Sequence, residues 1–238
     1  MRRCLYFLCA VTLGASLGLA QAPRFGLGLD PSTLGLGIEG AVRTTDSTNF
    51  RLGFNTFNYG RTLNHDGLNY SGRLDLQSLH ASFDWFFWGG LHLSPGVMLY
   101  NNNHASAGVA VPSGQQFSLG GTTYTSGSTP VGGSGLVNFS HAGPMLTLGW
   151  GNMVPRDGAR LSFHFETGVA YQSTPQVALN LTGIVCDSTG TVCQPVASYP
   201  GLPANIQQEE LNLQGKLHLL KTYPILSFGL SYSFGGNS

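Results

Sequence analysis

Apolar and polar residues alternate along most of this chain. In the clearest segment, residues 161–171, Leu161, Phe163 and Phe165 alternate with Ser162 and His164. A repeat of two residues is that of a β-strand, whose side chains point to opposite faces in turn. Similar alternation is present in eight segments, at 33–44, 49–54, 73–85, 91–99, 146–150, 161–171, 177–181 and 226–234. The pattern predicts an all-β fold.

The third segment contains a break in phase. Leu74 and Leu76 carry the apolar face at its start, whereas Leu79, Ala81 and Phe83 carry it further along. The apolar face therefore moves by one residue near Ser78. An additional residue in one strand would produce such a shift, so we expect a β-bulge there.

Two long connections separate the later segments. Residues 101–133 are dense in Asn, Gly, Ser and Thr, which predicts an exposed loop, with a further strand at 116–125. The connection at 186–222 contains Pro203, a suitable first residue for a short helix, followed by Ile206, Leu213, Leu217 and Leu220 on one helical face. Whether this helix lies at a membrane interface or enters a barrel lumen is left open.

The number of strands has two solutions. Eight strands starting at Thr33 place the long 101–133 loop on the side where barrels of bacterial outer membranes have short turns. Adding strands at 25–29 and 192–199 gives ten strands and moves the 101–133 loop to the side where such barrels have long loops. We predict eight and keep ten as the alternative.

Composition favours a membrane barrel over a soluble sandwich. Charged residues make up 9% of the chain and hydrophobic residues 42%, whereas soluble domains are about 25% charged. The polar faces carry mainly Gly, Ser, Thr and Asn, and an aromatic cluster at 83–88 ends one segment, as an interfacial girdle would. Eleven basic and eleven acidic residues balance, which excludes a nucleic-acid-binding surface of the usual kind. We therefore predict a transmembrane antiparallel β-barrel, with an exported soluble sandwich as the alternative.

The amino terminus has the layout of a secretory signal peptide. Arg2 and Arg3 precede an apolar stretch that ends in small residues at Ala20. We predict a signal peptide at 1–20 and one barrel domain at 21–238, rather than a helical anchor. In an exported chain Cys186 and Cys193 are expected to form a disulfide across a short loop.

The last segment, 223–234, resembles the closing strand of Gram-negative outer-membrane barrels. That resemblance implies an assembly signal at Tyr232 and Phe234 for the barrel assembly machinery, and a location in outer-membrane lipid. With this segment, the whole chain resembles the small OmpA-like or OmpW-like outer-membrane barrel proteins through Tyr59, Asp66, Tyr70, Asp84-Trp85-Phe86, Ser94-Pro95-Gly96, Tyr100-Asn101-Asn102-Asn103 and Gly149-Trp150-Gly151-Asn152.

Ionisable residues on the polar faces are the candidate site. They are Glu39, Arg43, Arg51, Arg73, Asp75, Asp84, His92, His164 and Glu166. An eight-strand barrel is only wide enough for side chains to fill it, so we expect these groups to pair across strands in a lumenal charge network. The chain is then expected to have a structural or surface-interaction role, without cofactor or metal. The alternatives are a small pore or a carrier for small or apolar solutes.

An enzyme is the least favoured reading. Ser162, His164 and Glu166 suggest a lipid-modifying hydrolase, but residues two apart on a strand are separated by about 7 Å. A nucleophile and its base need a distance of about 2.6–3.2 Å. Only a base from another strand, such as His92 or His141, would complete the pair.

Overall fold

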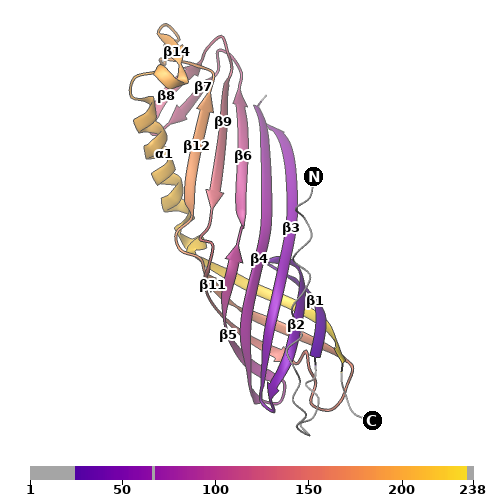
Figure 1. Cartoon of the computed structure of the whole chain (residues 1–238). Helices are drawn as coiled ribbons and strands as arrows, with labels where there is room; N and C mark the ends of the chain where they lie inside the picture. Colours follow the sequence, from indigo (N-terminus) through magenta and orange to yellow (C-terminus); the bar gives the residue numbers. More distant parts are fainter. Residues whose placement is uncertain (1–24, 66–67, 235–238) are drawn as a thin grey trace, which may run out of the picture.

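The computed structural model describes residues 25–65 and 68–234, and eight of its strands close into an antiparallel barrel (Figure 1). The ring closes where the first strand pairs with the last and the fourth with the fifth. In order around the ring, the strands are β1 (Phe25–Ser32), β2 (Gly35–Thr45), β3 (Thr48–His65), β4 (Leu68–Trp88), β5 (Leu91–Asn101), β10 (Gly143–Gly151), β11 (Leu161–Tyr171) and β15 (Thr222–Phe234). The predicted eight-strand barrel is confirmed. The predicted signal peptide lies outside the described residues.

The membership of the ring differs from the prediction by one strand. β1 belongs to it, whereas the segment at 177–181 lies in β12 (Gln176–Thr182), which pairs only with β9. With β1 counted in the ring, the long connections no longer lie on the side where outer-membrane barrels have short turns. Short connections at 46–47, 89–90 and 152–160 now share one end of the barrel, and the long connections at 102–142 and 172–221 share the other.

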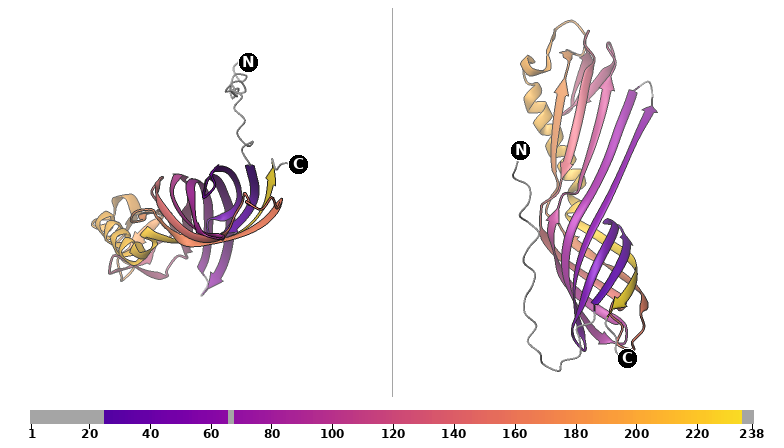
Figure 2. Two further views of the ribbon diagram at one scale, coloured as in Figure 1. Left: turned by 90° about the horizontal axis from the view of Figure 1, so that it is seen from below. Right: turned by 45° about the vertical axis from the view of Figure 1, so that its right-hand side comes forward.

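An open sheet continues upward from one side of the barrel. β3 and β4 have 18 and 21 residues, against 11 for β11, and their additional length pairs with strands outside the ring. β4 pairs with β5 below and with β6 above, where Asp75 is opposite His104. We call the part above the barrel the upper sheet; its order is β12-β9-β6-β4-β3, with β6 at His104–Val111 and β9 at Val131–Asn138. Figure 2 shows barrel and upper sheet from two further directions.

A small second sheet and a helix pack against the upper sheet. The second sheet contains β7 (Gln116–Leu119), β8 (Thr122–Ser126), β13 (Ile184–Cys186) and β14 (Cys193–Pro195). In place of the single strand expected at 116–125, β7 and β8 form a hairpin with its turn at 120–121. Only three residues of the segment at 192–199 form a strand, and they lie outside the ring. The expected disulfide, Cys186–Cys193, joins β13 and β14.

The expected helix is present as α1 (Leu202–Leu217), between the 3₁₀ turns Val196–Ser198 and His218–Lys221. It lies along the outer edge of β12, outside the barrel lumen (Figure 1). The Leu179 amide donates to the Glu210 carboxylate over 2.7 Å, and the Gly120 amide donates to Glu209 over 3.2 Å. The first bond occupies a backbone donor on the open edge of β12, which pairs on its other side with β9. No helix of the described residues is long and apolar enough to cross a bilayer.

The sheet reverses its polarity where it leaves the barrel. On the outward face of β3, the apolar residues Phe50 and Leu52 are followed further up by Asn58 and Thr62; on the inward face, Arg51 and Asn55 are followed by Phe57 and Tyr59, with Arg61 above them. β4 behaves in the same way: inward-facing His80 and Asp84 lie in the barrel, and inward-facing Leu74 and Leu76 lie above it.

The shift of the apolar face near Ser78 is therefore not caused by a bulge in β4, so that prediction was wrong. The β3–β4 register runs without a shift through the pair Asn55 and Ser78. A shift does occur beside it in the β4–β5 ladder, between Leu79 and His80, where the additional residue, Leu99, belongs to β5. The apolar face of β4 changes sides because the surroundings of the strand change.

Candidate functional site in the barrel interior

Arg51 of β3 lies at the centre of a buried charge network. Its Nη1 is 3.1 Å from Glu39 Oε2 of β2, and its Nε is 2.9 Å from Asp84 Oδ1 of β4. Its Nη2 contacts Glu166 of β11. The side chains of all four residues are at most 5% exposed. One planar guanidinium thus binds carboxylates from three different strands, which its fixed fork of donors allows.

Neutral donors and histidines complete the shell around these carboxylates. Ser94 donates to Asp84 over 2.7 Å, and Thr147 donates to Glu166 over 2.8 Å. His80 Nε2 is 2.9 Å from Glu39 Oε1. His92 Nε2 is 3.1 Å from Glu166 Oε1, and its Nδ1 is 3.2 Å from the Gly90 carbonyl oxygen. Both ring nitrogens of His92 therefore lie next to oxygen atoms of other groups.

His164 and Asp30 form a less tightly bonded part of the network. His164 Nε2 is 3.8 Å from Asp30 Oδ1 and 3.9 Å from Glu39 Oε2, too far for hydrogen bonds. Three atoms in this part have no hydrogen-bond partner among the described residues: both ring nitrogens of His164 and Asp30 Oδ1. The His164 ring lies against the backbone of Gly229 in β15, where a side chain would collide with it.

The sequence identified most, but not all, of these residues. Of the nine ionisable residues expected in the lumen, the structure brings six together: Glu39, Arg51, Asp84, His92, His164 and Glu166. The sequence missed Asp30, because β1 was not counted among the eight strands. It also missed His80, although the alternation along β4 places His80 on the same face as Ser82 and Asp84.

Three of the expected lumenal residues lie elsewhere, which corrects the prediction. Arg43, near the end of β2, pairs with Asp46 beside the short turn. Arg73 Nε is 2.8 Å from Asp75 Oδ2, and the Arg73 side chain is 61% exposed. Both residues point outward from the upper part of β4. The sequence shows that they share a strand with the lumenal residues but not that β4 extends beyond the barrel.

Charges in the interior are unequal. Four carboxylates, from Asp30, Glu39, Asp84 and Glu166, surround Arg51, the one buried arginine of the described residues, and three histidines lie among them. Buried carboxylates are costly unless paired. Each of the three histidines lies within 4.0 Å of at least one of these carboxylates.

Apolar side chains close both ends of the barrel. At the upper end, Leu34, Met98, Met145 and Ile225 form a buried cluster with Ala170. At the lower end, Met153 and Val154, which follow β10, are buried against Ala41. The lower segment is held by bonds from Asn49 to Asn152 at 2.8 Å and from Arg156 to Asn49 at 3.0 Å. The charge network lies between these two seals.

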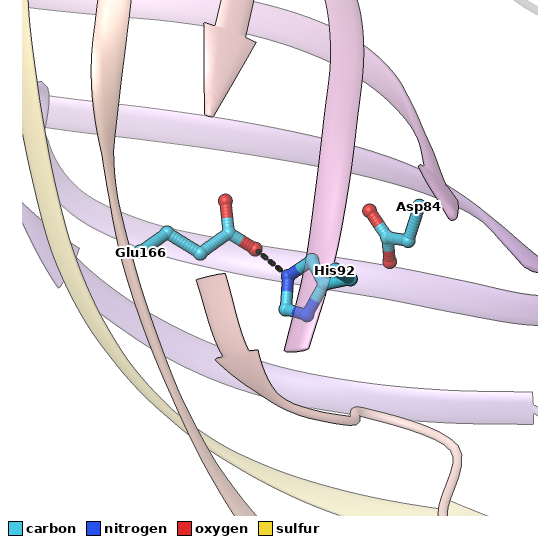
Figure 3. Close-up of side chains that lie close together, drawn as sticks. All are labelled: Asp84, His92 and Glu166. Carbon is cyan, nitrogen blue, oxygen red and sulfur yellow. Dashed lines mark hydrogen bonds and ion pairs between the residues drawn. The ribbon is translucent and has the colours of Figure 1, made fainter. Parts of the chain in front are cut away.

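Asp84, His92 and Glu166 have the composition of a metal site, but their donor atoms are already engaged. One ligand atom from each lies within 4.8 Å of the others (Figure 3). Asp84 and Glu166 bind Arg51, and Glu166 also binds His92. A metal ion would have to displace the guanidinium, so the donor set does not fit a metal.

The hydrolase arrangement is not formed by the residues that suggested it. Ser162 Oγ is 2.7 Å from Ser231 Oγ of β15, a pairing between two hydroxyl groups. His92, one of the two bases considered for it, is engaged with Glu166. The hydroxyl of Ser162 thus bonds to another hydroxyl and not to an activating base.

An eight-strand antiparallel barrel with apolar residues outside and a filled polar interior is the fold class of small outer-membrane barrels. Solved structures share the fold. The chain is similar to CarO2 of Acinetobacter baumannii, with 16% identity, a TM-score of 0.57, and coverage of 89% of this chain and 98% of the other. For CarO of the same organism the values are 17%, 0.57, 88% and 97%. No family model matches the chain, and no curated protein matches it.

Proposed function

We propose that this protein is an integral outer-membrane barrel with a closed interior, whose role is to hold the upper sheet outside the membrane for structural or surface interactions. The observation that carries this proposal is the sealed lumen. The Arg51 network fills the middle of the barrel, and apolar clusters cover it above and below. A closed barrel leaves the upper sheet as the part that can meet other molecules.

The outer surface of the barrel supports a bilayer location. Large apolar side chains are exposed on all sides of the ring, including Leu29, Ile38, Phe163 and Phe228. Exposed aromatic residues, among them Trp88 and Trp150, lie at its lower end, where an interfacial girdle is expected. In water such a surface would be an aggregation hazard; in lipid it is the solvated side.

Orientation follows from the connections. Outer-membrane barrels have short turns on the periplasmic side and long loops outside. On that rule the upper sheet, α1 and the disulfide loop face the exterior. Export through the signal peptide at 1–20 and recognition of Tyr232 and Phe234 by the assembly machinery remain predictions; both aromatic side chains point outward at the end of β15.

Two measurements test the proposal. Membrane fractionation followed by a detergent gel is expected to show a compact species that slows on boiling, as folded barrels do. Purified protein in planar bilayers is expected to give no reproducible conductance steps, because the lumen is filled. A freely soluble monomer would contradict the membrane assignment, and large single-channel steps would contradict the closed interior.

A carrier for small apolar solutes is the second candidate function. The observation in its favour is an apolar pocket on the upper sheet, formed together with α1. Uptake of an uncharged apolar dye by cells with and without the protein tests this function: faster uptake with the protein would favour the carrier.

A further inference from the structure

The inward face of the upper sheet contains a hollow that its covering elements do not fill. A cavity of about 490 Å³ lies between this face, the carboxyl-terminal half of α1 and the β7 strand. Its floor is formed by β6, β9 and β12, with Tyr70 of β4 at one side. Figure 1 shows these strands above the barrel. It is separate from the charge network, which lies below the apolar seal of Met98 and Ile225.

The hollow has a cause in the strand register. Ala107 of β6 is opposite Gly135 of β9. These two lining residues form a row with almost no side-chain volume. Larger residues surround the row, and Leu213 and Leu217 of α1 face it from the side. The helix therefore cannot close onto the sheet at this point.

The lining is apolar and carries no charge. The aliphatic residues Val109, Val177 and Leu181 line it together with Phe117, and no Lys, Arg, His, Asp or Glu is among the lining residues. A carboxylate or phosphate group would lose its water here without gaining a partner, which excludes fatty acids and phospholipid headgroups as inner ligands. Tyr70, which is 40% exposed, lies at the edge of the cavity and gives access to it.

We propose that this cavity binds an uncharged, apolar small molecule of a few fused or linked rings. Its volume is about three times the roughly 150 Å³ of an engineered protein cavity that holds benzene, and is typical of small-molecule sites. The proposal rests on the proposed function only in placing the upper sheet in water outside the membrane, and it does not depend on a closed lumen.

Two alanines of β6 provide a matched pair of variants. Ala107 lines the cavity, whereas Ala110 is not among the lining residues and points to the opposite face of the same sheet. Ala107→Leu fills the hollow, and Ala110→Leu adds the same side chain outside it. Leu213→Ala provides a third variant, which enlarges the cavity from the helix side.

The test is titration of the full processed chain, held in amphipol, with the uncharged fluorophore N-phenyl-1-naphthylamine. Wild type and Ala110→Leu are expected to bind one fluorophore per chain saturably, and Ala107→Leu to bind it at least about tenfold more weakly because its side chain occupies the site. Leu213→Ala is expected to retain binding. Equal binding by the two leucine variants, or no saturable binding by wild type, would overturn the proposal. The gel shift on boiling, measured on each sample, reports separately on the barrel.

Discussion

The barrel and the upper sheet are built on the same two strands, yet they are inside out relative to each other. In the lower part of β3, Arg51 points inward and Leu52 points outward; in the upper part, Phe57 and Tyr59 point inward and Asn58 and Thr62 point outward. The backbone pairing does not change between the two parts. The difference fits the proposed surroundings, lipid around the barrel and water around the upper sheet, because the medium that each face contacts selects which face is apolar.

The inner faces of the two parts are also stabilised by different interactions. The barrel interior excludes lipid and holds polar groups that bind one another, as Arg51 and its carboxylates do. The inner face of the upper sheet is covered by α1 and the small sheet, and Val131, Val185 and Leu202 form an apolar core there. Hydrogen bonds and ion pairs therefore fix the first region, and apolar burial stabilises the second.

The largest effect is expected from removing the central charge of the barrel. Arg51→Met leaves three directly bound carboxylates without their cation, and a loss of about 3–5 kcal/mol in the free energy of unfolding is expected for breaking a buried ion pair. Arg73→Met is the control, because water screens the exposed Arg73–Asp75 pair and its loss should change the free energy of unfolding far less. Urea unfolding in lipid vesicles, followed by tryptophan fluorescence, measures both.

Arg51→Lys sharpens this comparison. It retains the charge but not the fork of donors, so its stability is expected to lie between those of wild type and Arg51→Met. Equal stabilities of Arg51→Met and Arg73→Met would show that the buried network does not hold the barrel together.

A smaller effect is expected from placing a charge on the outward face at two heights of β3. Leu52→Lys puts an ammonium group into the lipid-facing belt, which costs about 2–4 kcal/mol at the bilayer midplane and less toward its surface. Thr62→Lys places the same group on the same face in the upper sheet, where water solvates it and little change is expected. Unfolding in vesicles again provides the measurement, and equal losses at both positions would contradict the change of surroundings along the strand.

The smallest effect is expected at a carboxylate in water. Asp187, in the disulfide loop, accepts bonds from the Thr189 hydroxyl and from the amides of Val192 and Thr191, which lower its pKa to about 2. Because the folded pKa lies below the ordinary value, the ionised carboxylate supports the loop above about pH 4, and this support disappears as the pH falls toward 2.

Carbon-13 titration of the Asp187 carboxyl in the folded protein checks this value. A midpoint near 2 is expected, with the amide signals of Thr191 and Val192 moving at the same pH. Asp187→Asn should change these local signals and leave the heat shift of the barrel intact. A midpoint at the ordinary value of an aspartate would contradict the capping role.

Alternation of apolar and polar residues determined a large part of this architecture. It predicted strands, the barrel, the count of eight and six of the residues in the lumen, because a period of two residues assigns each side chain to a face without knowledge of the partners. Pro203 and the apolar residues after it predicted α1, and the spacing of Cys186 and Cys193 predicted the disulfide. These are local properties of the chain.

The tertiary structure alone decided which strands close the ring and where each strand leaves the barrel. The segment at 177–181 alternates as well as a ring strand does but pairs with β9, and Arg73 and Asp75 share β4 with the lumenal Asp84 but lie above the rim. His80 entered the network through Glu39 of another strand. Alternation says that a residue faces one side of a sheet; only the pairing of distant strands decides whether that side is a sealed lumen, a bilayer or water.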